Sequence, residues 1–121
     1  FVFPWAGYVT ATLNDNTCAF RNPATGNYRL TITGSGTSGA FTLASNGFTL
    51  PYQVFWNNRP NTTGTTQMTA GSRRNFGVFN VTTNTCGGGL NANLQIRVLG
   101  TALQAVPAGT YTGTLTVLQQ P

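Results

Sequence analysis

Residues that could carry out chemistry are scarce in this chain. Its 121 residues include one acidic side chain, Asp15, six arginines, two cysteines, and no lysine, glutamate or histidine. Enzymes move protons mainly with histidine, paired carboxylates and lysine. A glycosidase needs two carboxylates, a Ser-His-Asp triad needs its histidine, and a cysteine nucleophile is usually activated by one. We therefore predict that the protein is not an enzyme.

The same inventory argues against a bound metal or cofactor. Cys18 and Cys86 are too far apart for a CxxC motif, and the chain has no histidine to complete a cysteine-containing metal site. A calcium site usually needs several carboxylates, and the chain has one. In an oxidising compartment the two cysteines would form one structural disulfide, which typically contributes about 2–5 kcal/mol. The alternative is a pair of buried free thiols.

The basic charge balance does not lead us to expect a nucleic-acid partner. The net charge is +5 with a pI near 10.0, and a basic patch is how proteins engage phosphate backbones. The arginines are scattered, however, and Arg73-Arg74 is the only adjacent pair. The excess comes from missing acids rather than from a cluster of bases.

Binding and assembly are the functions that remain. Aromatic rings with neighbouring amides suit carbohydrates, and Trp56, Asn57, Asn58 and Arg59 at the end of an expected strand form a candidate adhesive loop. The other candidate aromatics are Trp5, Tyr52 and Tyr111. Packing in the core competes with binding for Tyr52, Trp56 and Tyr111, since all three lie in alternating segments.

The elements that must position these residues are β-strands. The chain is rich in Gly, Thr, Asn and Ser and has no helical periodicity, so we predict one all-β domain over residues 1–121. No apolar run reaches the length of a membrane-spanning helix. No signal peptide is evident at Phe1, so we expect a mature or trimmed form, with residues 1–6 as a linker or N-terminal extension.

Seven or so short strands separated by turn signals favour a β-sandwich over a barrel. Asn, Asp and Thr at 14–17 predict a turn. Residues 57–71 predict a long surface loop or a poorly patterned edge strand. A proline inside one strand predicts an edge position or a break at Pro51, and a change of face is expected near Gly77. The expected strands are 7–14, 27–33, a short one around Phe41 and Leu43, 48–56, 73–82, 91–99 and 110–117.

The closing strand has nearly perfect alternation. Tyr111, Gly113, Leu115 and Val117 fall on one face, and threonines occupy the other. The sequence ends four residues after Val117, so we expect a sandwich with an unfilled edge.

These features together resemble the subunits of bacterial chaperone–usher pili, more closely the archaic and alternative groups with spore-coat-U-like pilin domains. The resemblance touches most of the chain, and the closing strand carries most of its weight. It is carried by Cys18, the strand Tyr28-Arg29-Leu30-Thr31-Ile32, the segment Leu50-Pro51-Tyr52-Gln53-Val54, the turn Cys86-Gly87-Gly88-Gly89 and the segment from Pro107 to Val117.

The resemblance implies an incomplete immunoglobulin-like sandwich, completed by a donor strand from another polypeptide. A periplasmic chaperone, an outer-membrane usher and neighbouring pilus subunits would be its partners, and it would pass through the periplasm to the cell surface to act in adhesion or biofilm formation. Chaperone and donor strand would bind a groove lined by Tyr111, Gly113, Leu115 and Val117.

Two roles within a pilus remain open, as does a different class of protein. If residues 1–14 form the first strand, the chain is the pilin domain of a two-domain tip adhesin or a trimmed form. If Val9, Ala11 and Leu13 are a donor motif, it is a shaft subunit. The alternative class is a self-contained secreted β-sandwich that binds carbohydrates or surfaces.

Overall fold

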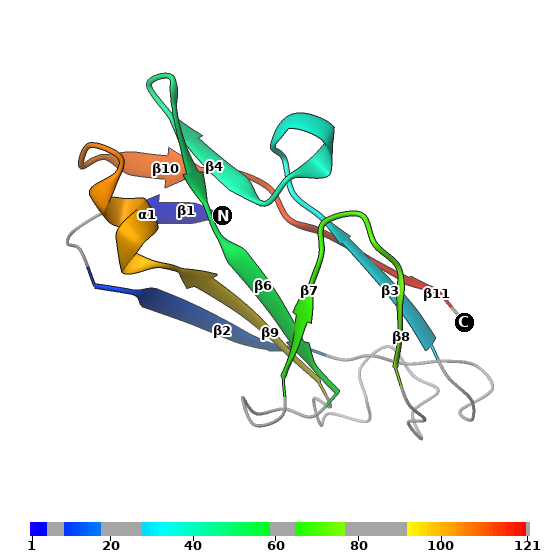
Figure 1. Cartoon of the computed structure of the whole chain (residues 1–121). Helices are drawn as coiled ribbons and strands as arrows, with labels where there is room; N and C mark the ends of the chain where they lie inside the picture. The colour runs from blue at the N-terminus through cyan, green and yellow to red at the C-terminus, as the bar shows by residue number, and fades with distance from the viewer. Residues whose placement is uncertain (5–8, 18–27, 59–64, 77–91, 121) are drawn as a thin grey trace.

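The chain folds as an all-β, sandwich-like protein, as predicted. The structure, a computed structural model, describes residues 1–4, 9–17, 28–58, 65–76 and 92–120. These residues form eleven short strands in three antiparallel sheets, with one 3-10 turn and one five-residue α-helix (Figure 1).

Each of the three sheets has a defined order of paired strands. The first is β1 (Val2–Pro4), β10 (Thr110–Thr112), β4 (Thr42–Ser45) and β5 (Phe48–Pro51). The second is β11 (Thr116–Gln120), β3 (Tyr28–Thr33) and β8 (Arg74–Phe76). The third is β2 (Ala11–Thr17), β9 (Ala92–Val98), β6 (Gln53–Asn57) and β7 (Thr66–Met68). The 3-10 turn η1 is Thr37–Gly39, and the helix α1 is Gly100–Gln104.

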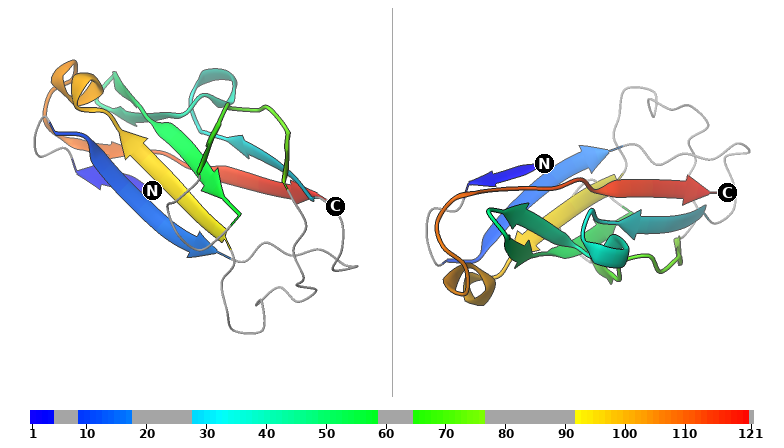
Figure 2. Two further views of the ribbon diagram at one scale, coloured as in Figure 1. Left: turned by 60° about the horizontal axis from the view of Figure 1, so that its bottom comes forward. Right: turned by 90° about the horizontal axis from the view of Figure 1, so that it is seen from above.

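The first two sheets are joined end to end along the closing segment of the chain. Only Gly113–Leu115 separate β10 from β11, and β10 pairs with β4 while β11 pairs with β3. Figures 1 and 2 show β10 leading into β11 along one side of the molecule. The third sheet shares a single core with these two sheets.

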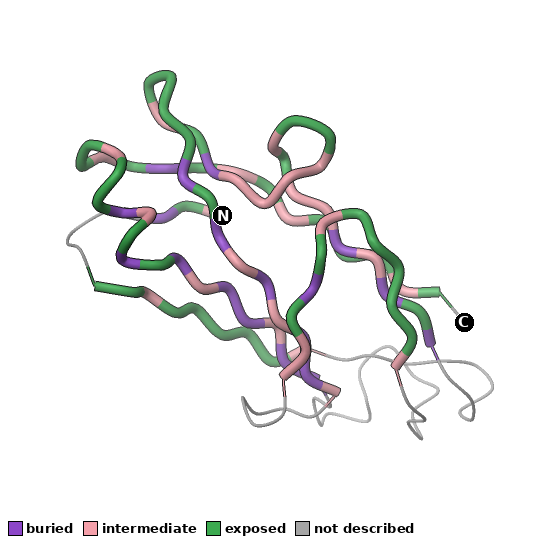
Figure 3. Tube along the Cα trace, viewed as in Figure 1, coloured by how far each residue is buried: buried purple, intermediate pink, exposed green. Residues whose placement is uncertain are grey.

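The core is built from the inward positions of the strands, because alternate residues of a strand face opposite sides. Figure 3 shows the resulting alternation of buried and less buried positions along β3 and β6. Leu103 of α1 joins the same cluster. The buried apolar residues are Phe3, Tyr28, Leu30, Ile32, Leu43, Leu50, Tyr52, Val54, Trp56, Met68, Ala92, Ile96, Val98, Leu103 and Tyr111.

Several predicted strands are confirmed. The strand expected over 27–33 is β3, and the short strand at Leu43 is β4. A break near Pro51 is also confirmed, since β5 ends there and β6 begins at Gln53. The strand expected over 91–99 is β9, in which the polar residues Asn93 and Gln95 are buried as well as most of the apolar ones.

The turn predicted at 14–17 is wrong, because β2 continues through Thr17. Two amide pairs hold this polar stretch in the sheet. Asn93 Nδ2 donates to Asn16 Oδ1 at 2.9 Å, and Gln95 Nε2 donates to Asn14 Oδ1 at 3.0 Å. The side-chain amides that favour turns locally therefore bond across strands here.

Other predictions are altered or fall outside the described residues. The first strand, expected over 7–14, is found as β2 at 11–17, and Val2–Pro4 forms the separate strand β1. Within residues 57–71, expected to be a long surface loop or a poorly patterned edge strand, Thr66–Met68 forms the edge strand β7. β8 covers only Arg74–Phe76 of the strand expected over 73–82. Trp5, Cys18, Arg59, Gly77 and Cys86 lie outside the described residues, and so does the expected disulfide.

The predicted single closing strand is interrupted at Gly113, where the backbone packs too closely for a side chain. A Cβ at Gly113 would lie 2.8 Å from Leu43 Cδ2 and 2.8 Å from Ser35 Oγ. The same serine hydroxyl accepts the Thr114 N–H at 2.9 Å, and the Gly113 N–H donates to the Phe1 carbonyl at 3.0 Å. Gly113 thus lies where the chain passes from one sheet to the next.

We expect Gly113→Ala to lower the free energy of unfolding by about 1–3 kcal/mol, the usual cost of overpacking. Gly109→Ala is the matched control, since a Cβ there meets Ser45 Oγ at an ordinary 3.5 Å. Urea denaturation of both variants measures the difference. Equal stability of the two alanine variants would contradict this account of the break.

Candidate strand-binding groove between β2 and β11

Two edge strands face each other across an open groove. Among the described strands, β2 pairs only with β9 and β11 pairs only with β3. Each strand therefore keeps one edge whose backbone N–H and C=O groups have no partner strand in the described part of the chain. Such an edge is a template for pairing with a further strand.

The beginning of the chain already covers the neighbouring edge of β10. β1 pairs antiparallel with β10, with Val2 opposite Thr112 and Pro4 opposite Thr110. The amino group of Phe1 also donates to the Gly113 carbonyl. The Phe1 ring meets the Tyr52 ring edge to face, with centroids 5.2 Å apart. The uncovered edge of the closing segment therefore begins just beyond Gly113.

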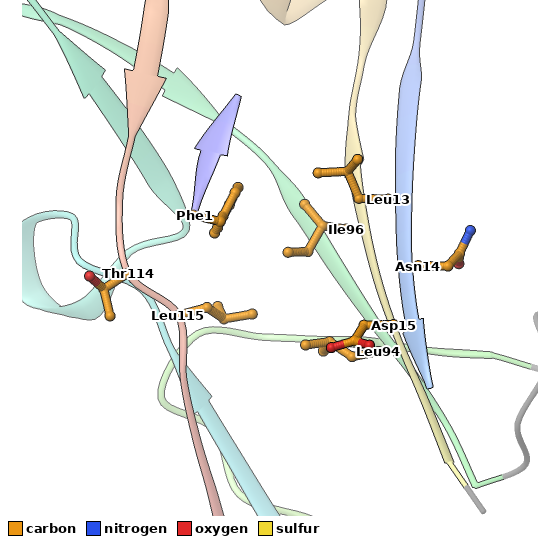
Figure 4. Close-up of a pocket in the computed structure, with 8 residues that line it drawn as sticks. All are labelled: Phe1, Leu13, Asn14, Asp15, Leu94, Ile96, Thr114 and Leu115. Carbon is orange, nitrogen blue, oxygen red and sulfur yellow. The ribbon is translucent and has the colours of Figure 1, made fainter. Parts of the chain in front are cut away.

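The first part of the groove is a cavity of about 360 Å³ (Figure 4). Its walls are mainly apolar side chains from both sides of the groove, with Phe1 at one end. Leu13 is 43% exposed although its side chain points inward, because nothing in the described structure fills the space above it. The lining residues are Phe1, Leu13, Asn14, Asp15, Leu94, Ile96, Thr114 and Leu115.

A second cavity of about 250 Å³ continues the groove toward the ends of β2 and β11. Asp15 and Leu94 line both cavities, so the two form one groove along the strands. Val117 contributes a 40% exposed side chain. The lining residues are Asp15, Thr17, Trp56, Leu94, Val117 and Gln119.

The amide pairs on β2 decide which of its residues face the groove. Asn14 and Asn16 bond to Gln95 and Asn93 on one face of the sheet. Alternation then puts Leu13, Asp15 and Thr17 on the opposite face, where the groove lies. Figure 4 shows the side chains of Leu13 and Asp15 directed into the cavity and that of Asn14, which also borders it, directed away.

The four predicted groove residues divide into two pairs. Leu115 and Val117 line the groove. Tyr111 does not, since it is 1% exposed in the core, and its hydroxyl donates to the Pro107 carbonyl at 2.6 Å. Gly113 lies at the junction of β10 and β11, where its backbone bonds to Phe1.

The candidate adhesive loop does not present an exposed aromatic face in the described residues. Trp56 is 3% exposed and Asn57 is 5% exposed, whereas Asn58 is partly exposed. Tyr52 is buried as well. Core packing, the competing interpretation of these aromatics, is what the structure shows for Tyr52, Trp56 and Tyr111.

Trp56 is held in place at the far end of the groove by a buried polar chain. Its Nε1–H donates to the Tyr28 hydroxyl at 2.9 Å, and that hydroxyl donates to Asn58 Oδ1 at 2.6 Å. Burial raises the pKa of Tyr28 to about 12, and the hydrogen bond from Trp56 opposes part of that shift. The phenol is therefore neutral and able to donate at ordinary pH.

The β2 wall of the groove was not predicted from the sequence. Leu13, Asp15 and Leu94 were not assigned to it, because alternation shows which face a residue occupies but not which strand lies at an edge. One usable signal was present, since Asn14 and Asn16 alternate with the same spacing as Asn93 and Gln95, and such polar pairs stabilise neighbouring strands.

Comparisons with protein-family models, curated proteins and solved structures found no match. In the described part of the chain, no helix has the length and apolar character needed to cross a membrane.

We expect Tyr28→Phe and Tyr52→Phe to have different effects on stability. Loss of the Tyr28 hydroxyl leaves Trp56 Nε1–H without its buried acceptor, which should cost about 1–3 kcal/mol. The Tyr52 hydroxyl is buried with no hydrogen-bond partner among the described residues, so its removal should be neutral or stabilising. Chemical denaturation of both variants measures this, and equal destabilisation would refute the proposed role of Tyr28.

Proposed function

We propose that this chain is a structural subunit, or a subunit domain, of a surface pilus, and that a strand from another polypeptide completes its fold. The observation that supports this most directly is the apolar groove between β2 and β11, whose facing edges have no partner strand among the described residues. A strand placed there would extend the sheet of β11 by the strand-addition mode of recognition.

The side chains around the groove supply a reason for such a strand to bind. Four apolar side chains that line the groove are incompletely buried. They are Leu13, Leu94, Leu115 and Val117. Covering apolar surface contributes about 25 cal/mol per Å², so filling two cavities with apolar side chains would contribute several kcal/mol.

The same surface explains a need for assistance before assembly. Unpaired strand edges next to exposed apolar residues promote aggregation, and the chain has no lysine to discourage edge pairing. In the proposed pathway a periplasmic chaperone covers the groove first. An outer-membrane usher then exchanges it for a donor strand from a neighbouring subunit, and the product is a cell-surface fibre that acts in adhesion or biofilm formation.

The alternative of a self-contained carbohydrate-binding module has less support. Three of its four aromatic candidates, Tyr52, Trp56 and Tyr111, are buried, and stacking on a sugar requires an accessible ring face.

The proposal is tested with capped peptides that alternate threonine with valine and differ only at one central position. A length of about ten residues spans about 33 Å in an extended strand. We expect at least one peptide of the set to bind the whole chain and to raise its melting temperature. Saturation at a hundred times the Kd would stabilise the fold by about 2.7 kcal/mol.

Val117→Asn and Leu118→Asn form a matched pair of variants for this test. The first places an amide in the groove, and the second replaces a 51% exposed leucine on the opposite face of β11. We expect Val117→Asn to weaken binding at least about tenfold, which corresponds to about 1.4 kcal/mol, and Leu118→Asn to leave it unchanged. If no peptide of the set binds, or if both variants bind equally well, the proposed function is wrong.

A further inference from the structure

The only acidic side chain of the protein lies inside the groove. Asp15 lines both cavities, on the inward face of β2 between Leu13 and Thr17. The other residues that line the cavities carry no ionisable side chain, and the amino group of Phe1 is bonded to the Gly113 carbonyl. The only carboxylate of the chain therefore lies midway along a largely apolar channel.

Water can solvate this charge only while the groove is open. Asp15 is exposed in the structure, and it forms no ion pair with any arginine among the described residues. A strand that fills the groove would remove water from the carboxylate, and burying an unpaired charge is strongly unfavourable. An occupant that brings a compensating cation avoids that penalty.

We propose that the strand which fills this groove carries a lysine or arginine opposite Asp15, with apolar side chains on either side of it. This inference rests on the proposed function and specifies the chemistry of the partner. Charge complementarity of this kind selects partners and sets register. Asp15 therefore determines both which strand binds and in which register it lies along the groove.

The spacing along the groove fits such a pattern. Leu13, Asp15 and Thr17 are successive inward residues of β2, and Leu115, Val117 and Gln119 alternate in the same way on the other side. Successive inward residues of a strand are about 6.6 Å apart. An occupant with apolar, cationic and apolar residues at every second position matches the first cavity, Asp15 and the second cavity in turn.

Residues 1–20 of a second copy do not meet this requirement. Residues 1–20 contain no lysine or arginine, the first being Arg21. The segment with Val9, Ala11 and Leu13, which could serve as a donor motif, therefore offers only apolar and polar side chains. The proposal assigns the groove to a different, cationic segment.

The experiment compares three capped peptides from the same alternating set, with lysine, glutamine or norleucine at the centre. Each reads the same in both directions, so the result does not depend on the orientation of binding. Affinity is measured by isothermal titration calorimetry for the unmodified chain, for Asp15→Asn, and for the double variant Asn14→Asp with Asp15→Asn. The double variant keeps the net charge but moves the carboxylate to the outer face of β2, where it can still accept from Gln95.

We expect the unmodified chain to bind the lysine peptide at least about tenfold more tightly than either neutral peptide. Both variants should lose this preference, and the norleucine peptide should bind them more tightly than it binds the unmodified chain. A peptide made from residues 7–14 should bind the unmodified chain more weakly than the lysine peptide.

Equal binding of the lysine and neutral peptides would overturn the inference, as would a lysine preference that survives in the double variant. Tighter binding of the 7–14 peptide would also overturn it and would favour a second copy as the donor. In each of these outcomes peptides still bind, so the proposed function stands. If no peptide binds any form of the chain, the proposed function itself fails.

Discussion

The close packing of backbone at Gly113 is the constraint on which the groove depends. With no side chain there, Leu43 and Ser35 can approach, and the closing segment passes from the first sheet to the second. β10 is then paired on both sides, by β1 and β4, whereas β11 has one partner, β3, among the strands that the structure describes. An uninterrupted strand would have the same neighbours along its whole length. The break at Gly113 instead separates β10, whose edge is covered by β1, from β11, whose edge can accept another strand.

Burial in this fold was largely predictable from sequence, whereas the position of β2 opposite β11 across the groove was not. The alternation of Leu30 with Arg29 and Thr31 identifies β3 and its inward face, and Val54 and Ile96 follow the same rule. Tyr111 shows the limit of that rule. Its inward position was correctly predicted, but it packs in the core between paired strands, while Val117 on the same face borders the open groove. Edge position depends on pairing between segments that are distant in sequence.

The polar stretch of β2 was mispredicted for a related reason. Asn14, Asp15 and Asn16 have local preferences for turns, and nothing near them in sequence opposes those preferences. Their strand conformation is stabilised by Asn93 and Gln95, which are more than seventy residues away along the chain. Tertiary contacts thus override local propensity. They also direct the Asp15 carboxylate into the groove, whereas a turn would have left it on the outer surface.

An inward-pointing charge next to an open edge has two physical effects, and both favour a selected partner. It penalises any purely apolar strand that enters the groove, because such a strand would desolvate Asp15 without compensation. The Asp15 charge does not weaken the binding of a cationic strand, because the cation compensates the buried carboxylate. The net charge of +5 repels identical copies as whole molecules, whereas Asp15 acts locally on the strand that enters the groove. A single acid at the junction of the two cavities can therefore contribute solubility before assembly and specificity during it.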